Sequence, residues 1–290
     1  MFSQDPQYEK LSLAKRVIPK KGSDAAAFVF MFVMLWVISL FELLVVLPIY
    51  HEFLSTWYLI HVFCGLFMFL NVFANLYKVI TTDTTGAKLG MPSVLKPGWA
   101  YCPFCQLNSP PRAYHCHVCD ICVLRRDHHC IFAGKCVGHS NYRYYLFLAF
   151  YLWLGALYAN LFHWEYVTSV MDNFTLWTMF TMFMPMLSWM LGYTTIYQTF
   201  VTFITAISLF AFVMFSGLLF FQLNIIARGQ TSYERKRKRR IYDKGWLRNF
   251  IEVLGENWFL SWIWPKITSP LPHNGTDYTQ ACNEELPKDM

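Results

Sequence analysis

The chain has 290 residues, of which 56% are hydrophobic and 19% aromatic, while only 14% are charged. A soluble domain typically carries about 25% charged residues, so the composition argues against a soluble globular protein and favours a membrane protein. The formal net charge is +6, and the basic residues other than Lys78 lie outside the apolar runs, in the N-terminal segment, the middle and the C-terminal tail.

Two long apolar runs come first in the chain. They cover residues 25–50 and 57–80, and the short link "HEFLST" separates them. A membrane-spanning helix needs about 20 mainly apolar residues, and both runs are long enough. The first run is long for the core of a signal peptide, so we expect it to be retained. The sequence therefore predicts a cytosolic N-terminal segment at 1–24 and transmembrane helices 1 and 2 within 25–80, with Glu42 inside the first span.

A polar segment at 81–143 follows and holds seven of the nine cysteines. The runs 144–170 and 199–226 behind it are again long enough to span a membrane. The stretch 173–193 between them is apolar but contains Pro185, and it could be a full span, a re-entrant segment or an interfacial segment. The sequence is therefore compatible with either five or four spans.

The basic residues favour four spans, because short cytosolic flanks are enriched in Lys and Arg. Residues 162–198 contain no Lys or Arg, whereas an unbroken basic run covers 235–240. Four spans place every basic region in the cytosol. They give transmembrane helices 3 and 4 within 144–227, a lumenal apolar segment near 173–193 with a glycosylation sequon at Asn173, and a cytosolic C-terminal segment at 228–290. We find no internal repeats.

The cysteine-rich segment has the spacing of a zinc-binding domain. In the cytosol disulfides are rare, and C-x2-C pairs suit a tetrahedral zinc. The segment offers seven cysteines and the histidines His115, His117, His128, His129 and His139. Two Cys3His sites would leave one cysteine over, which the spacing does not identify. The alternative is a simple zinc finger, although its position between spans argues against nucleic acid as the partner.

The order of these residues resembles a known family. "CPFC", "PPRAYHC" and "DHHCIFAGKC", the last followed by Asn141, are similar to the cysteine-rich domain of DHHC-type protein S-acyltransferases. The resemblance covers residues 102–141 closely and extends more loosely to the spans. It implies an all-α polytopic membrane protein with four transmembrane helices and a cytosolic two-zinc domain of short β-hairpins between helices 2 and 3.

The resemblance also implies a role for each ligand residue. One structural Zn²⁺ would be bound by Cys102, Cys105, His115 and Cys122. The other would be bound by Cys116, Cys119, His129 and Cys136. The cysteine left over is then Cys130, which the family uses as its nucleophile.

Flanking motifs match the family less closely. Only Asp83 and Gly86 correspond to its Asp-Pro-Gly motif after the second span. "TSYE", with Thr231, Ser232 and Glu234, is close to the structural Thr-Thr-x-Glu motif, and Asn249 corresponds to the asparagine of the C-terminal motif. The usual Pro-Trp after DHHC is replaced by Ile131-Phe132, which suggests an atypical branch.

Asp127, His128 and Cys130 form the expected catalytic set. An ordinary cysteine is only a few per cent ionised at pH 7, so its proton must be taken. His128 is the expected base, and Asp127 would fix the imidazole tautomer. Cys130 would receive a long-chain acyl group from acyl-CoA and pass it to a cysteine of a protein substrate. From the residues alone, His128 could equally be a third zinc ligand or a structural polar residue.

The acyl-CoA donor suggests further contacts. Arg125, Arg126 and Lys135 are candidates for its phosphates. Phe132, Tyr145, Leu148 and Gly155 are candidates for the acyl chain, although the small residues of that span could equally serve helix packing.

We therefore expect a protein S-palmitoyltransferase in a Golgi or endoplasmic reticulum membrane, with its active site facing the cytosol. Its partners would be acyl-CoA, the bilayer and protein substrates with membrane-proximal cysteines, and no nucleic acid. The alternative is a catalytically weak or inactive zinc-bearing membrane adaptor that binds protein partners. A transporter has little support, because the spans contain few polar residues.

Overall fold

The computed structural model describes residues 18–86, 89, 91–171 and 175–278. The sequon at Asn173 lies outside these residues. The chain forms two compact units. The first, which we call the cysteine-rich unit, comprises Met1–Met31, Phe73–Phe147 and Phe221–Met290; the second, the helical unit, comprises Phe32–Val72 and Leu148–Phe220.

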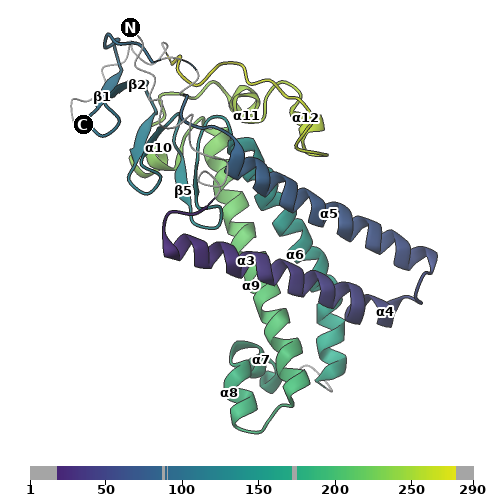
Figure 1. The fold of residues 1–290 in the computed structure, drawn as a ribbon. Coiled ribbons are helices and arrows are strands. Elements are labelled where there is room, and N and C mark those ends of the chain that lie inside the picture. Colours follow the sequence, from purple (N-terminus) through teal and green to yellow (C-terminus); the bar gives the residue numbers. More distant parts are fainter. Residues whose placement is uncertain (1–17, 87–88, 90, 172–174, 279–290) are drawn as a thin grey trace. The chain divides into compact units, whose positions relative to one another are not determined.

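Four helices of the described chain are long and apolar enough to cross a membrane. The first covers Gly22–Tyr50 and consists of α3 (Gly22–Phe41), the π-helical turn η1 (Glu42–Val46) and α4 (Leu47–Tyr50). The others are α5 (Thr56–Thr81), α6 (Tyr142–Val170) and α9 (Ile196–Ala227) (Figure 1). The shortest has 26 residues and a length of about 39 Å, which exceeds the roughly 30 Å hydrocarbon core. The prediction of a mainly helical protein with four candidate membrane helices is confirmed.

The helical unit has an aromatic and aliphatic core. Its buried residues are Phe41, Val46, Tyr166, Val167, Val201 and Ile204. The unit also contains the acidic residue of the first span: a carboxylate oxygen of Glu42 lies 2.7 Å from Nε2 of the fully buried His163. A charge within a span is costly unless a partner faces it, and His163 is that partner.

Two short helices, α7 (Leu176–Phe183) and α8 (Pro185–Met190), connect α6 to α9. They lie beside the ends of these helices (Figure 1). Thr175 caps α7, because its hydroxyl accepts a hydrogen bond from the Thr178 N–H. Pro185 stands at the first position of α8, where its missing N–H costs nothing. Neither helix is long enough to cross a membrane by itself.

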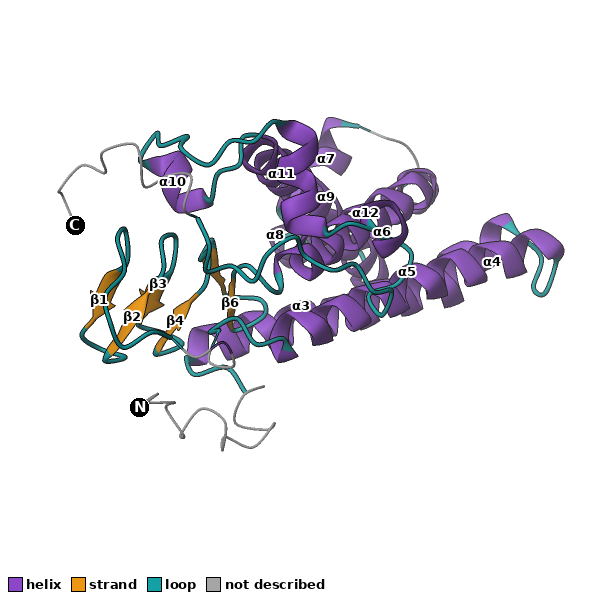
Figure 2. Ribbon diagram, turned by 90° about the horizontal axis from the view of Figure 1, so that it is seen from above, coloured by secondary structure: helices purple, strands orange, loops and turns teal. Residues whose placement is uncertain are grey.

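The cysteine-rich unit contains three two-stranded antiparallel hairpins (Figure 2). They pair β1 (Ala100–Cys102) with β2 (Leu107–Ser109), β3 (Tyr114–Cys116) with β4 (Ile121–Val123), and β5 (His128–Cys130) with β6 (Lys135–Val137). They follow α5 and precede α6, so the expected β-hairpins between helices 2 and 3 are confirmed. Three short helices follow α9: α10 (Ser232–Lys236), α11 (Trp246–Leu254) and α12 (Trp258–Ser261).

Candidate metal and acyl-transfer site

The three hairpins are copies of one local structure. Their first strands begin at residues 100, 114 and 128, a spacing of 14. Each hairpin closes with a four-residue turn whose last residue has a positive φ: Gln106 at 53°, Asp120 at 57° and Gly134 at 59°. The chain therefore contains a short internal repeat, contrary to the expectation from the sequence.

Comparing equivalent positions shows where the third copy differs. The first two turns read Cys-x2-Cys, with Cys102 and Cys105 in one and Cys116 and Cys119 in the other. The third has a cysteine, Cys130, at the first of these positions and Ala133 at the second. The third hairpin thus keeps one thiol where the other two present a pair.

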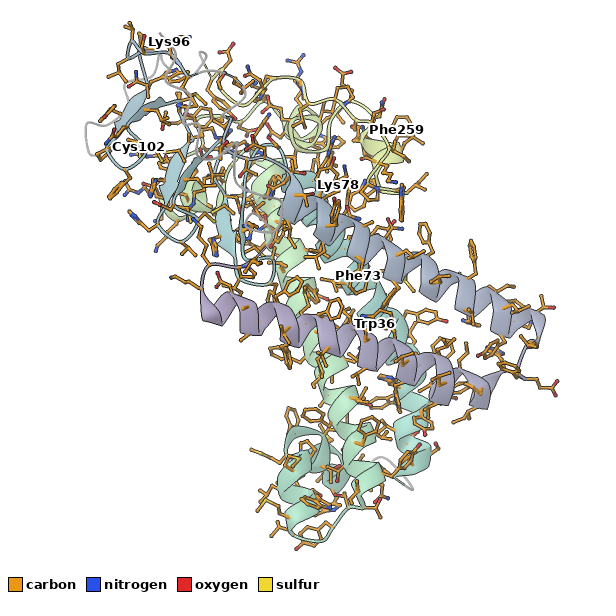
Figure 3. All side chains as sticks on the ribbon, viewed as in Figure 1. Trp36, Phe73, Lys78, Lys96, Cys102 and Phe259 are labelled. Carbon is orange, nitrogen blue, oxygen red and sulfur yellow. The ribbon has the colours of Figure 1, made fainter. Side chains whose placement is uncertain are left out.

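The first two hairpins together form one group of possible metal ligands. Cys102 and Cys105 come from the first turn, and His115 and Cys122 are cross-strand partners in the second hairpin. Their donor atoms all lie within 4.8 Å of one another, and the Cys105 sulfur is 3.3 Å from His115 Nδ1. Figure 3 marks Cys102 on the first hairpin.

The second and third hairpins form another group in the same way. The turn cysteines Cys116 and Cys119 meet His129 and Cys136, which are cross-strand partners in the third hairpin. His129 Nδ1 lies 3.3 Å from the Cys119 sulfur. Three thiols and one imidazole at this spacing fit a tetrahedral zinc, and thiolates this close together need a cation between them. Both groups contain the residues that the family resemblance assigned to its two zinc sites.

The remaining histidines of the segment belong to neither group. His139 is buried and faces the backbone carbonyl of His273, 2.8 Å from its Nε2. The ring of His117 contacts Phe104 and His115. His128 lies on β5, next to the ligand candidate His129.

The strand β5 separates its two histidines. Successive side chains of a strand point to opposite faces, so His128 and Cys130 share one face while His129 is on the other. The face of His129 carries the metal-ligand group. The other face therefore holds an imidazole and a thiol that are free of that group.

Asp127 orients the His128 ring and raises the pKa of its imidazole. The Asp127 carboxylate accepts a hydrogen bond from His128 Nδ1–H at 2.7 Å. Burial disfavours the imidazolium, but hydrogen bonds with Asp127 and Cys130 outweigh it and raise the pKa of His128 to about 9. Burial likewise opposes the charge of Asp127, yet its bonds with His128 and Ser232 hold its carboxyl pKa below the usual value. At neutral pH the pair is carboxylate and imidazolium.

The "TSYE" motif holds Asp127 from the opposite side. Ser232 donates its backbone N–H to one carboxylate oxygen at 2.7 Å and its hydroxyl to the other at 2.8 Å. Thr231 and Glu234 form a capping box at the start of α10, which sets the position of Ser232. The motif thus supports the Asp127 carboxylate.

Arg112 completes this support, and the sequence did not single it out as a site residue. Its guanidinium forms a bidentate pair with Glu234 at 2.8 Å and donates to the Gly229 carbonyl at 2.9 Å. Tyr242 stacks 4.2 Å from the guanidinium carbon. The only sequence signal for Arg112 is its place in "PPRAYHC", between the two Cys-x2-Cys turns.

Asn249 ties the next segment to the end of α9. Its amide donates to the Ala227 carbonyl at 3.0 Å and to the Asp243 carboxylate at 2.7 Å. Its oxygen accepts the Lys244 N–H at 3.0 Å. These three hydrogen bonds of a buried side chain hold the loop that follows α10.

Two of the three basic candidates for CoA, Arg126 and Lys135, lie beside thiols of the second metal-ligand group. Arg125 is only 4% exposed, with its guanidinium 5.5 Å from the centroid of the Tyr142 ring. Arg126 contacts the thiols of Cys116 and Cys136. Lys135 pairs across the hairpin with Cys130, and partial burial lowers its pKa. Their contact with CoA phosphates stays a prediction, and of the three Arg125 is the least accessible.

The four candidates for the acyl chain lie in two places. Phe132 is in the turn of the third hairpin, and the buried Tyr145 in the first turns of α6 packs its ring 4.8 Å from that of His128. Leu148 and Gly155 lie further along α6, in the helical unit, where a Cβ added to Gly155 would meet nothing within 4 Å. Tyr145 is thus the candidate that the structure brings to His128.

Asp24, a second residue that the sequence did not indicate as part of the site, contacts His129 on strand β5. Its carboxylate lies 2.9 Å from Nε2 of His129, and its side chain is almost fully buried. It stands in the first turn of α3, 105 positions before the histidine. No spacing pattern connects residues so far apart, so the sequence could not have indicated this contact.

Comparison with known proteins agrees with this geometry. A model of the family described as DHHC palmitoyltransferase matches residues 96–239. "Probable palmitoyltransferase ZDHHC24" of Danio rerio is 35% identical over 237 residues, covering 81% of this chain and 80% of that protein. The Homo sapiens protein of the same name is 33% identical over 220 residues, covering 75% and 77%. "Probable protein S-acyltransferase 5" of Arabidopsis thaliana is 35% identical over 164 residues, covering 54% and 31%.

Proposed function

Since the chain belongs to the DHHC palmitoyltransferase family, we propose that it transfers acyl groups through a covalent intermediate on Cys130. Its function is that of a protein S-palmitoyltransferase. The observation that most supports the role of Cys130 is its place on β5: it is outside both metal-ligand groups and on the face of His128, whose imidazole is paired with Asp127.

The raised pKa of His128 suits this residue to hold a proton during the proposed reaction. With a pKa of about 9, His128 can hold the proton that the Cys130 thiol gives up when it reacts. The imidazolium stabilises the thiolate, and the thiolate is the reactive form of cysteine. Asp127 keeps the imidazole oriented and stabilises its charge.

The reaction then follows in two balanced steps. In the first, the Cys130 sulfur bonds to the acyl carbonyl carbon of acyl-CoA, the bond from that carbon to the CoA sulfur breaks, and the CoA thiolate takes the proton of His128. In the second, a substrate cysteine gives its proton to His128 and bonds to the acyl carbon, which releases the Cys130 thiolate. The products are free CoA and an S-acylated protein.

Zinc bound at the two groups would hold the hairpins together, a structural contribution. Each group would link two consecutive hairpins, so the reacting strand β5 would be fixed through His129 and the first two hairpins in turn. The chain's own residues do the chemistry: His128 holds and moves the proton, Asp127 orients the ring, and Ser232 orients Asp127.

An apolar acyl chain gains about 0.8 kcal/mol for each CH₂ that leaves water, which favours a site next to the bilayer. Tyr145 marks the start of α6 beside His128, and Leu148 and Gly155 on the same helix are the proposed further contacts. The proposed site faces the cytosol, because the basic segments flank it. The proposed membrane is that of the Golgi or endoplasmic reticulum, which is usual for the family. Substrates would then be proteins with cysteines near that surface.

A labelling experiment tests this function. The full chain is purified in detergent and incubated with labelled palmitoyl-CoA. We expect label on the wild type that hydroxylamine removes, no label on Cys130→Ser, and wild-type label on Cys64→Ser, which changes an exposed cysteine of α5. An unlabelled wild type would favour the adaptor function instead.

A further inference from the structure

The contact between Asp24 and His129 joins the first membrane helix to the strand that carries the nucleophile. Nδ1 of His129 faces the thiols of the second metal-ligand group, while Nε2 lies 2.9 Å from the Asp24 carboxylate. We propose that Asp24 is a positioning residue: it holds the His129 imidazole in the tautomer and orientation that a metal ligand needs, and so fixes β5. Its consequence for catalysis, though not for metal binding, rests on the proposed function of Cys130.

The tautomer follows from the hydrogen bond. A carboxylate can only accept, so Nε2 must carry the proton that it donates to Asp24. In the neutral ring Nδ1 is then left with a lone pair, which is the form that binds a metal. A carboxylate on the far nitrogen of a ligating histidine also raises its basicity, and its removal typically costs about 10–100-fold in metal affinity.

Two more contacts fasten the segment around Asp24 to the same hairpins. Lys20 donates its ammonium to the Cys119 carbonyl at 2.7 Å, in the turn of the second hairpin. Pro19 packs on the turn of the third hairpin, where a Cβ on Gly134 would come within 2.8 Å of it. Residues 19–24 therefore contact both hairpins that supply the second group.

Among the residues that the structure describes, no carboxylate from another element faces the histidine of the first group. Its histidine, His115, faces Asp120 at 3.6 Å, and the side chain of Asp120 is 75% exposed. That carboxylate belongs to the same hairpin as His115, so it ties no other element to the group. An exposed pair at this distance contributes little. Asp120 is therefore a matched control, because it has the same chemistry on the equivalent histidine.

The position of His129 on β5 explains how a loss of the Asp24 contact would slow the proposed acylation of Cys130. It is the neighbour of both His128 and Cys130 on β5. An imidazole that turns away from its group loosens the strand, and the sulfur of Cys130 is displaced from the place where it meets the acyl carbon. A misplacement of about 1 Å can cost roughly 100-fold in rate.

Zinc release from the purified full chain tests the proposal. Wild type, Asp24→Ala, Asp24→Asn and Asp120→Asn are mixed with a chromophoric chelator, and the release of each equivalent is timed. We expect Asp24→Ala to release one of two equivalents about 10–100-fold faster than wild type, with the other unchanged. Asp24→Asn keeps an acceptor oxygen without the charge and should lie between. Asp120→Asn removes the charge at a residue whose positive φ asparagine tolerates, and it should match wild type.

Two outcomes would overturn the proposal. One is equal release from wild type and both Asp24 variants. The other is accelerated release of both equivalents together, which a general loss of folding would cause. If Asp24→Ala does not fold, Asp24→Asn decides the same question.

Acylation provides the second readout. We expect Asp24→Ala to form the acyl-enzyme at least tenfold more slowly at saturating palmitoyl-CoA, and Asp24→Glu to regain part of the rate. The two arms fail separately: a wild type that takes no label defeats the proposed function, while faster zinc release from Asp24→Ala still supports the positioning role.

Discussion

His128 and His129 are adjacent and chemically identical, yet their environments differ because a strand alternates its faces. The His128 ring meets the Asp127 carboxylate and lies on the face of the nucleophile candidate, and the His129 ring meets three thiols and the Asp24 carboxylate. The sequence indicated which residue types take part, but the tautomers and charges of the two rings follow only from the groups around them.

The charge of His128 has a consequence for stability. Its pKa is raised to about 9 from 6.5, so the stabilisation from its pair with Asp127 is fully present below about pH 6.5 and is lost as the pH rises through 9. We expect the difference in melting temperature between wild type and His128→Asn to shrink from pH 7 to pH 10. Thermal unfolding in detergent at fixed ionic strength measures it, and a difference that grows with pH would contradict the assignment.

Ala133 allows a direct test of why Cys130 is reactive. It stands where the first two turns have their second cysteine. Ala133→Cys restores a Cys-x2-Cys turn, in which the Cys130 thiol can bind a metal or form a disulfide. We expect at least a tenfold loss of acylation.

Ala133→Ser, of nearly the same size, is the control for crowding at this buried position. Labelling with palmitoyl-CoA, before and after treatment with reductant, distinguishes the two variants. Equal labelling of both would mean that the turn does not control the thiol.

At the scale of elements, α10 depends on one buried ion pair. Glu234 caps the helix and pairs with Arg112, and both side chains are almost fully buried. Removing one partner of such a pair leaves an uncompensated charge and costs about 3–5 kcal/mol. Arg112→Met should therefore lower the melting temperature strongly and weaken acylation, since Ser232 loses its position.

The surface pair Arg240–Asp243 is the matched control for this prediction. Arg240 is more than half exposed, and such pairs contribute about 0–1 kcal/mol. Arg240→Met should shift the melting temperature little. Similar shifts for both variants would show that the buried pair does not support α10 as described.

The helices α7 and α8 have an inverted distribution of polarity. Small polar residues such as Thr178, Thr181 and Ser188 are buried, while Leu176 is 87% and Met190 75% exposed. No charged residue occurs from 173 to 227. An apolar exterior around a polar interior suits a lipid surrounding, because water would favour the reverse arrangement.

We therefore expect these two helices to lie within the apolar part of the membrane. An environment-sensitive fluorophore on Leu176→Cys or Met190→Cys, in a background without other free cysteines, should emit as in hydrocarbon after reconstitution. The same probe on Glu52→Cys, in the link before α5, should emit as in water. Water-like emission from all three would refute the membrane location.

At the scale of the molecule, length and composition were enough to find the four long helices, because each must satisfy its backbone within one apolar run. The ligand spacing was enough to expect two zinc sites. The 14-residue repeat is not apparent from the sequence, because its third copy lacks a cysteine and its first lacks a histidine. Asp24 and Arg112 could not be assigned, because their partners lie 105 and 122 positions away and only folding brings them together.

Metal removal should affect the hairpins but not the long helices. We expect two zinc ions for each chain by elemental analysis. A strong chelator should abolish acylation while far-UV circular dichroism keeps most of its helical signal, because the hairpins depend on the metal and the long helices do not. Restored labelling after zinc is added back is the control. Full activity in the zinc-free chain would contradict the structural role.

The three hairpins can also be regarded as a very short polymer, in which each unit donates its turn thiols to the next. A fourth hairpin would need about ten residues, as 100–109 form the first hairpin. Its histidine and cysteine would then form a third metal-ligand group that includes Cys130. Only residues 138–141 separate β6 from α6, so the candidate membrane helix begins before a fourth hairpin could form. The proposed nucleophile, Cys130, is then the end group of this series, and its proposed reactivity would come from where the series stops.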